Sequence, residues 1–135
     1  MIVREDTISL FDQDKQYVLD YLKSRGIKNR ELKRIIQSQP FGLLDDAGFS
    51  VDGEEYGISH FLTKSDIIGY DIKKTNAQLN TDSTSFVALA LVIGDDVLCY
   101  DTQAKEVFLW RIQTADGDHL LVSDNLSGFL KSINK

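Results

Sequence analysis

The chain has 135 residues, and 42% of them are apolar, which is typical of a globular protein and excludes a disordered chain. A single domain of this length, residues 1–135, buries roughly two-thirds of the surface of its unfolded chain. Acidic residues outnumber basic residues by 21 to 15, which gives a formal charge of −6. This charge favours a cationic partner and argues against direct binding to nucleic acid. The need for solubility alone also accounts for an acidic surface.

The N-terminal part predicts two helices. Apolar residues at helical spacing predict the first over Asp12–Arg25, and Gly26 suits the left-handed residue that ends a helix. Asn29 is a capping residue for a second helix that runs to Ser38. Pro40 ends that helix, because the residue before a proline is pushed out of helical geometry.

The middle of the chain predicts a hairpin and a third helix. Asp52-Gly53 is typical of a two-residue turn, so residues 49–51 and 54–56 are expected to pair, with 58–62 continuing as a strand. Ser65 is a capping residue for a helix whose apolar face repeats every three to four residues. The members of that face are Ile68, Ile72, Thr75 and Leu79. A polar loop over 80–84 follows.

The C-terminal part predicts an antiparallel meander and a closing helix. Four strand-like segments are separated by short turns: Phe86–Ile93, Val97–Asp101, Glu106–Ile112 and His119–Val122. The first is apolar throughout, as expected for a strand covered on both faces. Ser123 is expected to cap a last helix with Leu126, Phe129, Leu130 and Ile133 on one side. The fold class is therefore α+β, with a mostly antiparallel sheet, a C-terminal meander, and helices at the N-terminus, in the middle and at the C-terminus.

Catalytic, metal-binding and phosphate-binding motifs are not found in the sequence. A nucleophile elbow and a Gly-rich phosphate loop are both missing, and His60 and His119 are expected to be edge or partly exposed structural residues. Two histidines and the single cysteine, Cys99, do not make a zinc pattern. Cys99 lies in an apolar strand and is expected to pack as a small hydrophobe, without a disulfide partner. We expect no enzyme activity and no cofactor.

The N-terminus carries Glu5 and Asp6 early and has no long apolar run, so it does not resemble a signal peptide. The longest apolar run, Phe86–Ile93, is too short to span a bilayer. A cytoplasmic location without membrane contact is therefore the expectation.

Trp110 has two interpretations. On a strand it alternates with Phe108 and Ile112, and Arg111 points to the other face. Trp110 is then either a core aromatic or a partly exposed anchor, since tryptophan is enriched at binding hot spots.

Several short motifs occur together in the order of a known family. They are Ile58-Ser59-His60-Phe61-Leu62 followed by Ser65-Asp66-Ile67-Ile68, then Val97-Leu98-Cys99-Tyr100-Asp101, Val107-Phe108-Leu109-Trp110, and Ser123-Asp124-Asn125-Leu126-Ser127-Gly128-Phe129-Leu130. This pattern resembles the SUKH superfamily, the Smi/Knr-like group, over roughly Ile58 to Ile133. The resemblance implies an α+β sheet flanked by helices.

The resemblance also implies a function that is not enzymatic. Many bacterial members are immunity proteins that bind and neutralise a toxin, often a nuclease, and a basic toxin domain would be attracted to an acidic chain. Two alternatives stay open: a regulatory or scaffold interaction module of the same fold, and a small-molecule binder or enzyme.

Eight residues are the candidate contacts of such a partner. They are Glu54, Glu55, Asp95, Asp96, Asp101, Trp110, Asp116 and Asp118. We expect Asp95, Asp96 and Asp101 to lie at one end of the sheet with Glu54 and Glu55, and Asp116 and Asp118 to extend that surface. Aspartates beside glycine are also ordinary turn residues, because their side chains bond to nearby backbone.

Overall fold

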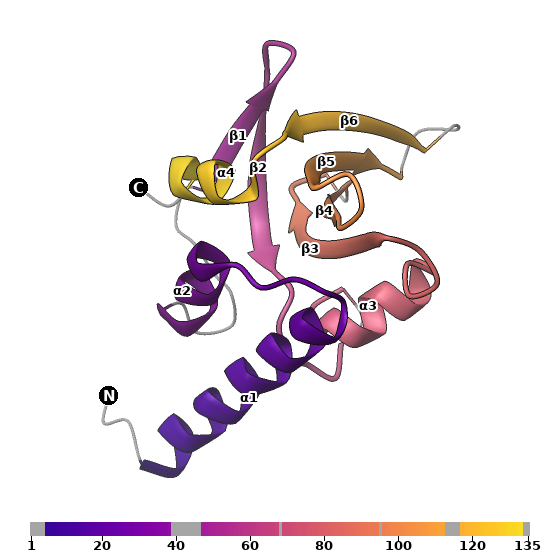
Figure 1. Ribbon diagram of the computed structural model, residues 1–135. Helices are drawn as coiled ribbons and strands as arrows, with labels where there is room; N and C mark the ends of the chain where they lie inside the picture. Colours follow the sequence, from indigo (N-terminus) through magenta and orange to yellow (C-terminus); the bar gives the residue numbers. More distant parts are fainter. Residues whose placement is uncertain (1–4, 39–46, 68, 95, 113–116, 134–135) are drawn as a thin grey trace.

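Six strands form one antiparallel sheet in chain order. The computed structural model describes residues 5–38, 47–67, 69–94, 96–112 and 117–133. Within these ranges the strands are β1 (Gly48–Val51), β2 (Glu54–Phe61), β3 (Phe86–Val92), β4 (Asp96–Asp101), β5 (Glu106–Arg111) and β6 (Asp118–Ser123). Each pairs with the next, and the sheet curves until β6 comes close to β1, so that its shape is nearly a barrel (Figure 1). The predicted meander is confirmed.

Four helices flank the sheet in the described part of the chain. They are α1 (Glu5–Ser24), α2 (Arg30–Ser38), α3 (Ile72–Gln78) and α4 (Leu126–Ile133). α1 packs on α2 and α3, α3 contacts β3, and α4 contacts α2, β1 and β5 (Figure 1). The predicted α+β class, with N-terminal, middle and C-terminal helices, is confirmed.

The first two helices are present where the sequence predicts them, but the predicted start of the first is wrong by seven residues. α1 begins at Glu5, before the predicted Asp12, and Gly26 follows its end with a φ of 81°. The side chain of Asn29 accepts a hydrogen bond from the Leu32 N–H at 3.0 Å, as a helix cap does. The predicted cap of α2 is therefore confirmed.

The predicted start of the third helix is wrong. α3 begins at Ile72, and its cap is Asp71, whose carboxylate accepts the Lys74 N–H at 2.9 Å. Gly69 has a φ of 99°, a conformation that a helix does not contain, so no helix runs through it from Ser65. The Ser65 hydroxyl instead accepts the Ile67 N–H in a local turn.

The predicted cap of the last helix is also wrong, by two residues. α4 starts at Leu126, and the Asn125 side chain accepts the Gly128 N–H at 3.0 Å. The Ser123 hydroxyl accepts the Asn125 N–H, so it shapes the turn before the helix. Both residue types can cap, and only the path of the chain out of β6 selects between them.

The sheet has an inner and an outer face. The Phe129 ring of α4 meets Phe49 edge-on at 5.6 Å, so α4 lies on the side to which Phe49 points. Residues that lie opposite each other on paired strands share a face of the sheet, and so do alternate residues of one strand. Followed through the strand register, Leu98 and Leu109 are on the same side as Phe49. We call it the inner face. Trp110 points to the other side, the outer face.

β3 is largely buried, as its apolar sequence predicts. Residues 87–90 are at most 3% exposed, whereas Ile93 lies beyond the end of β3 and is 70% exposed. Where β2 no longer pairs with β3, the Asn76 side chain takes its place. Its amide donates to the Ala88 carbonyl at 3.2 Å and its oxygen accepts the Ala88 N–H at 2.8 Å. A buried side chain from α3 thus completes the ladder of β3.

Candidate functional site

His60 and Cys99 are both buried in this structure. His60 is buried, contrary to the expected edge position, and both ring nitrogens are occupied, Nδ1 by the Ser59 hydroxyl at 3.0 Å and Nε2 by the Gly69 carbonyl at 2.7 Å. Its ring stacks on Tyr70 at 4.2 Å. Cys99 is fully buried, and burial raises the pKa of its thiol. Among the described residues no group of three His, Cys, Asp or Glu side chains could hold a metal ion.

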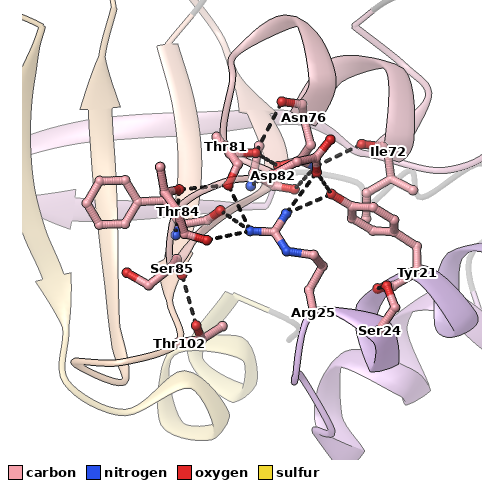
Figure 2. Close-up of polar contacts among 12 residues, drawn as sticks. Tyr21, Ser24, Arg25, Ile72, Asn76, Thr81, Asp82, Thr84, Ser85 and Thr102 are labelled. Carbon is pink, nitrogen blue, oxygen red and sulfur yellow. Dashed lines mark hydrogen bonds and ion pairs between the residues drawn. The ribbon is translucent and has the colours of Figure 1, made fainter.

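The densest polar cluster surrounds Arg25, at the end of α1 (Figure 2). Its Nη2 donates to three backbone carbonyls at 2.8–3.0 Å, those of Thr81, Thr84 and Phe86. Its Nη1 donates to the Tyr21 hydroxyl at 2.8 Å and to Asp82 at 3.1 Å. These acceptors occupy both Nη groups of the guanidinium, and they join α1 to the loop before β3 and to the start of β3.

Aromatic side chains gather on the outer face over β5 and β6. We call this the outer aromatic patch, which comprises Phe86, Phe108, Trp110, His119 and Leu121. Trp110 lies opposite Val97 and His119, and Phe108 lies opposite Cys99 and Leu121. The His119 ring touches three of the others, with centroids 4.9 Å from Phe108, 5.4 Å from Phe86 and 5.5 Å from Trp110.

Only part of the outer face is covered by other elements. Gly69 lies against the Leu91 side chain, so the segment before α3 covers the β3 side. Over β6, by contrast, Leu121 is 57% exposed and His119 is exposed as well. Trp110 is half-buried, with Gly117 close to its indole Nε1. The patch therefore presents apolar and aromatic surface beside a packed floor of Val97 and Cys99.

Three of the predicted acidic residues meet at one end of the sheet. We call this the acidic end, which comprises Glu54, Asp96 and Asp118. In the β5–β6 register Asp118 lies opposite Arg111. In the β4–β5 register Val97 lies opposite Trp110, which puts Asp96 beside Arg111. Arg111 therefore lies between the two carboxylates on the inner face. A cation thus interrupts the predicted acidic surface.

Tyr56 connects Glu54 to this group. Its hydroxyl donates to the Glu54 carboxylate at 3.0 Å. That hydrogen bond, followed by burial and the charge of Glu54, raises the pKa of Tyr56, and the charge of Arg111 opposes the shift. The charge of Asp96 also raises the pKa of Tyr56, so Glu54, Tyr56, Asp96 and Arg111 lie close together. Within the described residues, Asp96 Oδ1 is buried and has no hydrogen-bond partner.

The expectation that Asp101 joins them at one end of the sheet is wrong. Asp96 and Asp101 are the first and last residues of β4, about 17 Å apart at 3.4 Å per residue. The Asp101 carboxylate accepts the N–H groups of Gln103 and Ala104 in its own turn. Burial alone would raise the pKa of Asp101, but the hydrogen bonds from Ser85, Ala104 and Gln103 lower it overall.

The remaining predicted contacts are placed only in part. Glu55 is exposed on the hairpin, opposite Ser50 and on the other side from Glu54. Asp95 and Asp116 lie outside the described residues. Phe86, His119 and Leu121 were not predicted to belong to a site. The alternation of β5 and β6 carried the signal, because it puts Leu121 and His119 beside Phe108 and Trp110.

Comparisons with known proteins give no further assignment. No protein-family model matches the chain, and neither a curated protein nor a solved structure is found to be similar to it. Of the described helices, none is both long enough and apolar enough to cross a membrane.

Proposed function

We propose that this chain is a SUKH-like protein-binding domain that acts as an immunity protein. It neutralises a bacterial toxin by one-to-one binding in the cytoplasm and needs no cofactor. The toxins that such immunity proteins bind are often nucleases. The observation that carries the proposal is the outer aromatic patch, where the exposed His119 and Leu121 lie beside the half-buried Trp110 on the sheet. Partly exposed aromatic side chains on a packed floor are typical of binding hot spots.

The acidic end supports a basic partner. Trp110 and Arg111 are consecutive, so the outer aromatic patch reaches the same end of the sheet as Asp96 and Asp118, on the other face. A partner that docks over this end contacts aromatic surface and carboxylates together. A basic nuclease surface complements them and is steered toward them at low salt.

The first experiment co-expresses the chain with the product of the neighbouring open reading frame and scores growth and co-purification. Rescue of growth together with a stable complex supports immunity. A toxic neighbour that is neither bound nor neutralised overturns it, and recovery of host proteins instead supports the regulatory or scaffold alternative.

Two variants then locate the interface. Trp110→Ser removes the central aromatic group and should weaken the complex by about 2 kcal/mol, or roughly thirtyfold. The matched control is Ile67→Ser, since Ile67 is 62% exposed and lies in the segment before α3, outside the patch. Equal affinities of both variants would place the interface elsewhere.

Charge tests the acidic end separately. Reversing Asp96 and Asp118 to lysine should slow association with a basic partner about tenfold at low salt and much less at high salt. Asp66→Lys is the control, because Asp66 is exposed and lies before α3. An association rate that the double variant leaves unchanged at low salt contradicts electrostatic steering at this end.

A further inference from the structure

A groove of about 620 Å³ lies between α1 and α2, far from the outer aromatic patch. In Figure 1 the two helices diverge on the side of the molecule away from β5 and β6. Leu19 and Leu22 of α1, together with Ile27 and Leu32, form its apolar lining. All but the half-buried Leu19 are at most 6% exposed, so they make a packed floor.

Cations surround this floor. Between Asp20 and Arg34 the chain has six basic and two acidic residues, a formal charge of +4, which leaves −10 on the rest of the protein. The groove-lining cations are Lys23, Lys28, Arg30 and Lys33, and all four are exposed. An acidic protein thus concentrates positive charge at one groove.

These four cations are available to a partner. The other two basic residues of the stretch are engaged, Arg25 by Asp82 and carbonyls, and Arg34 by Glu31 at 3.6 Å. Across the described residues, the groove-lining cations make no ion pair. Four like charges around an apolar floor repel one another, and a bound anionic group relieves that repulsion.

We propose that the α1–α2 groove binds an acidic amphipathic segment of a partner protein. Its apolar side chains would pack on the floor and its carboxylates would pair with the surrounding lysines and arginine, as in helix-in-groove recognition. The part of α1 that lines the groove, Gln16–Lys23, is about 12 Å long at 1.5 Å per residue, so contact extends over about two turns of a bound helix.

The groove selects a peptide over a nucleic acid. Its floor has no aromatic platform among the lining residues, and the charge of −10 elsewhere repels a long phosphate backbone. The site is also opposite in charge to the acidic end. The proposal therefore does not depend on the immunity function, and the two surfaces take different partners.

The test uses a synthetic peptide and the full chain. The probe is a fluorescein-labelled helix of about four turns, with leucine at helical spacing and glutamate at the other positions, followed by anisotropy and by ¹H–¹⁵N spectra. We expect saturable binding, with shifts concentrated at residues 16–33. Reversing Lys23, Lys28 and Lys33 to glutamate should weaken it at least about tenfold, since several ion pairs are lost together.

Matched controls fix the interpretation. The same charge change at Lys74, Lys105 and Lys131, which lie outside the groove, should leave the affinity within about twofold. A peptide with lysine in place of glutamate, and a single-stranded oligonucleotide, should not bind. The groove variant should still neutralise the toxin, which separates this site from the immunity surface.

Three results would overturn the proposal. The first is no saturable binding of the acidic peptide to the unaltered chain. The second is spectral shifts that map to β5 and β6 in place of α1 and α2. The third is an oligonucleotide that binds the groove and displaces the peptide, which would make it a phosphate-backbone site.

Discussion

Replacing Arg25 should destabilise the protein, because its side chain joins the end of α1 to the start of β3. The change is Arg25→Met, which keeps the length of the aliphatic stem and removes the guanidinium. The Arg25 side chain is 13% exposed, and three backbone carbonyls lose their donor (Figure 2). Those carbonyls belong to Thr81 and Thr84 in the loop before β3 and to Phe86, the first residue of β3, so the loss is felt where α1 meets the sheet.

The magnitude follows from the contacts. A hydrogen bond to a charged group contributes about 1.5–3 kcal/mol, and one NH₂ group supplies two hydrogens to the three carbonyls. The desolvation cost of the guanidinium offsets part of this gain, which leaves about 3 kcal/mol. For a chain of this size that corresponds to about 10 °C in the melting temperature. Asp82 adds little, because its side chain is 52% exposed.

Urea denaturation followed by far-UV circular dichroism and Trp110 fluorescence measures the loss. The control is Arg34→Met, since Arg34 is 63% exposed and its pair with Glu31 should contribute below about 0.5 kcal/mol. Arg25→Lys should recover part of the stability, because it keeps the charge without the fork. If Arg25→Met unfolds at the same urea concentration as Arg34→Met, water satisfies the carbonyls and the reasoning is refuted.

Three other predictions concern buried polar groups. Asn76→Leu leaves the Ala88 N–H and carbonyl unpaired and should cost about 2–4 kcal/mol in urea unfolding, whereas a loss below 1 kcal/mol would show that β3 finds other partners. Cys99 should react with a thiol reagent such as Ellman's only after unfolding, because it is fully buried and burial raises the pKa of its thiol; rapid labelling of the native protein would contradict this. Burial, with hydrogen bonds to Asp71 and Asp82, raises the pKa of Tyr17 and Tyr21 from 10.0 to about 12. Since the unfolded chain releases these protons first, the contribution of the two tyrosines to stability should be constant below pH 10 and fall between pH 10 and 12, and a flat profile there would exclude such tyrosines.

The local elements were predictable because their signals are short-range. The Asp52-Gly53 turn, the apolar run of β3 and the Asn29 cap each depend on neighbours a few residues away. The wrong start of the third helix also has a local cause. Gly69 has a positive φ, and the spacing of the apolar residues does not reveal it.

The candidate site was predicted less well. Asp96 and Asp101 were expected together, although the strand between them already separates them by about 17 Å. The exposed apolar surface was missed because the exposed residues of β6 include Leu121, which composition alone would have placed inside.

Sequence pattern was sufficient for the α+β class, for the β1–β2 hairpin and for the order of strands in the C-terminal meander, because hydrophobic periodicity and turn residues act within a few positions of the chain. It was not sufficient for the contacts that join distant segments. Arg25 meets carbonyls 56 to 61 residues away, and Asn76 completes a ladder 12 residues on. Which face of the sheet stays uncovered, and where the cations of α1 and α2 surround a groove, likewise depend on how the helices pack. Packing is a property of all the surfaces together, so no local pattern encodes it.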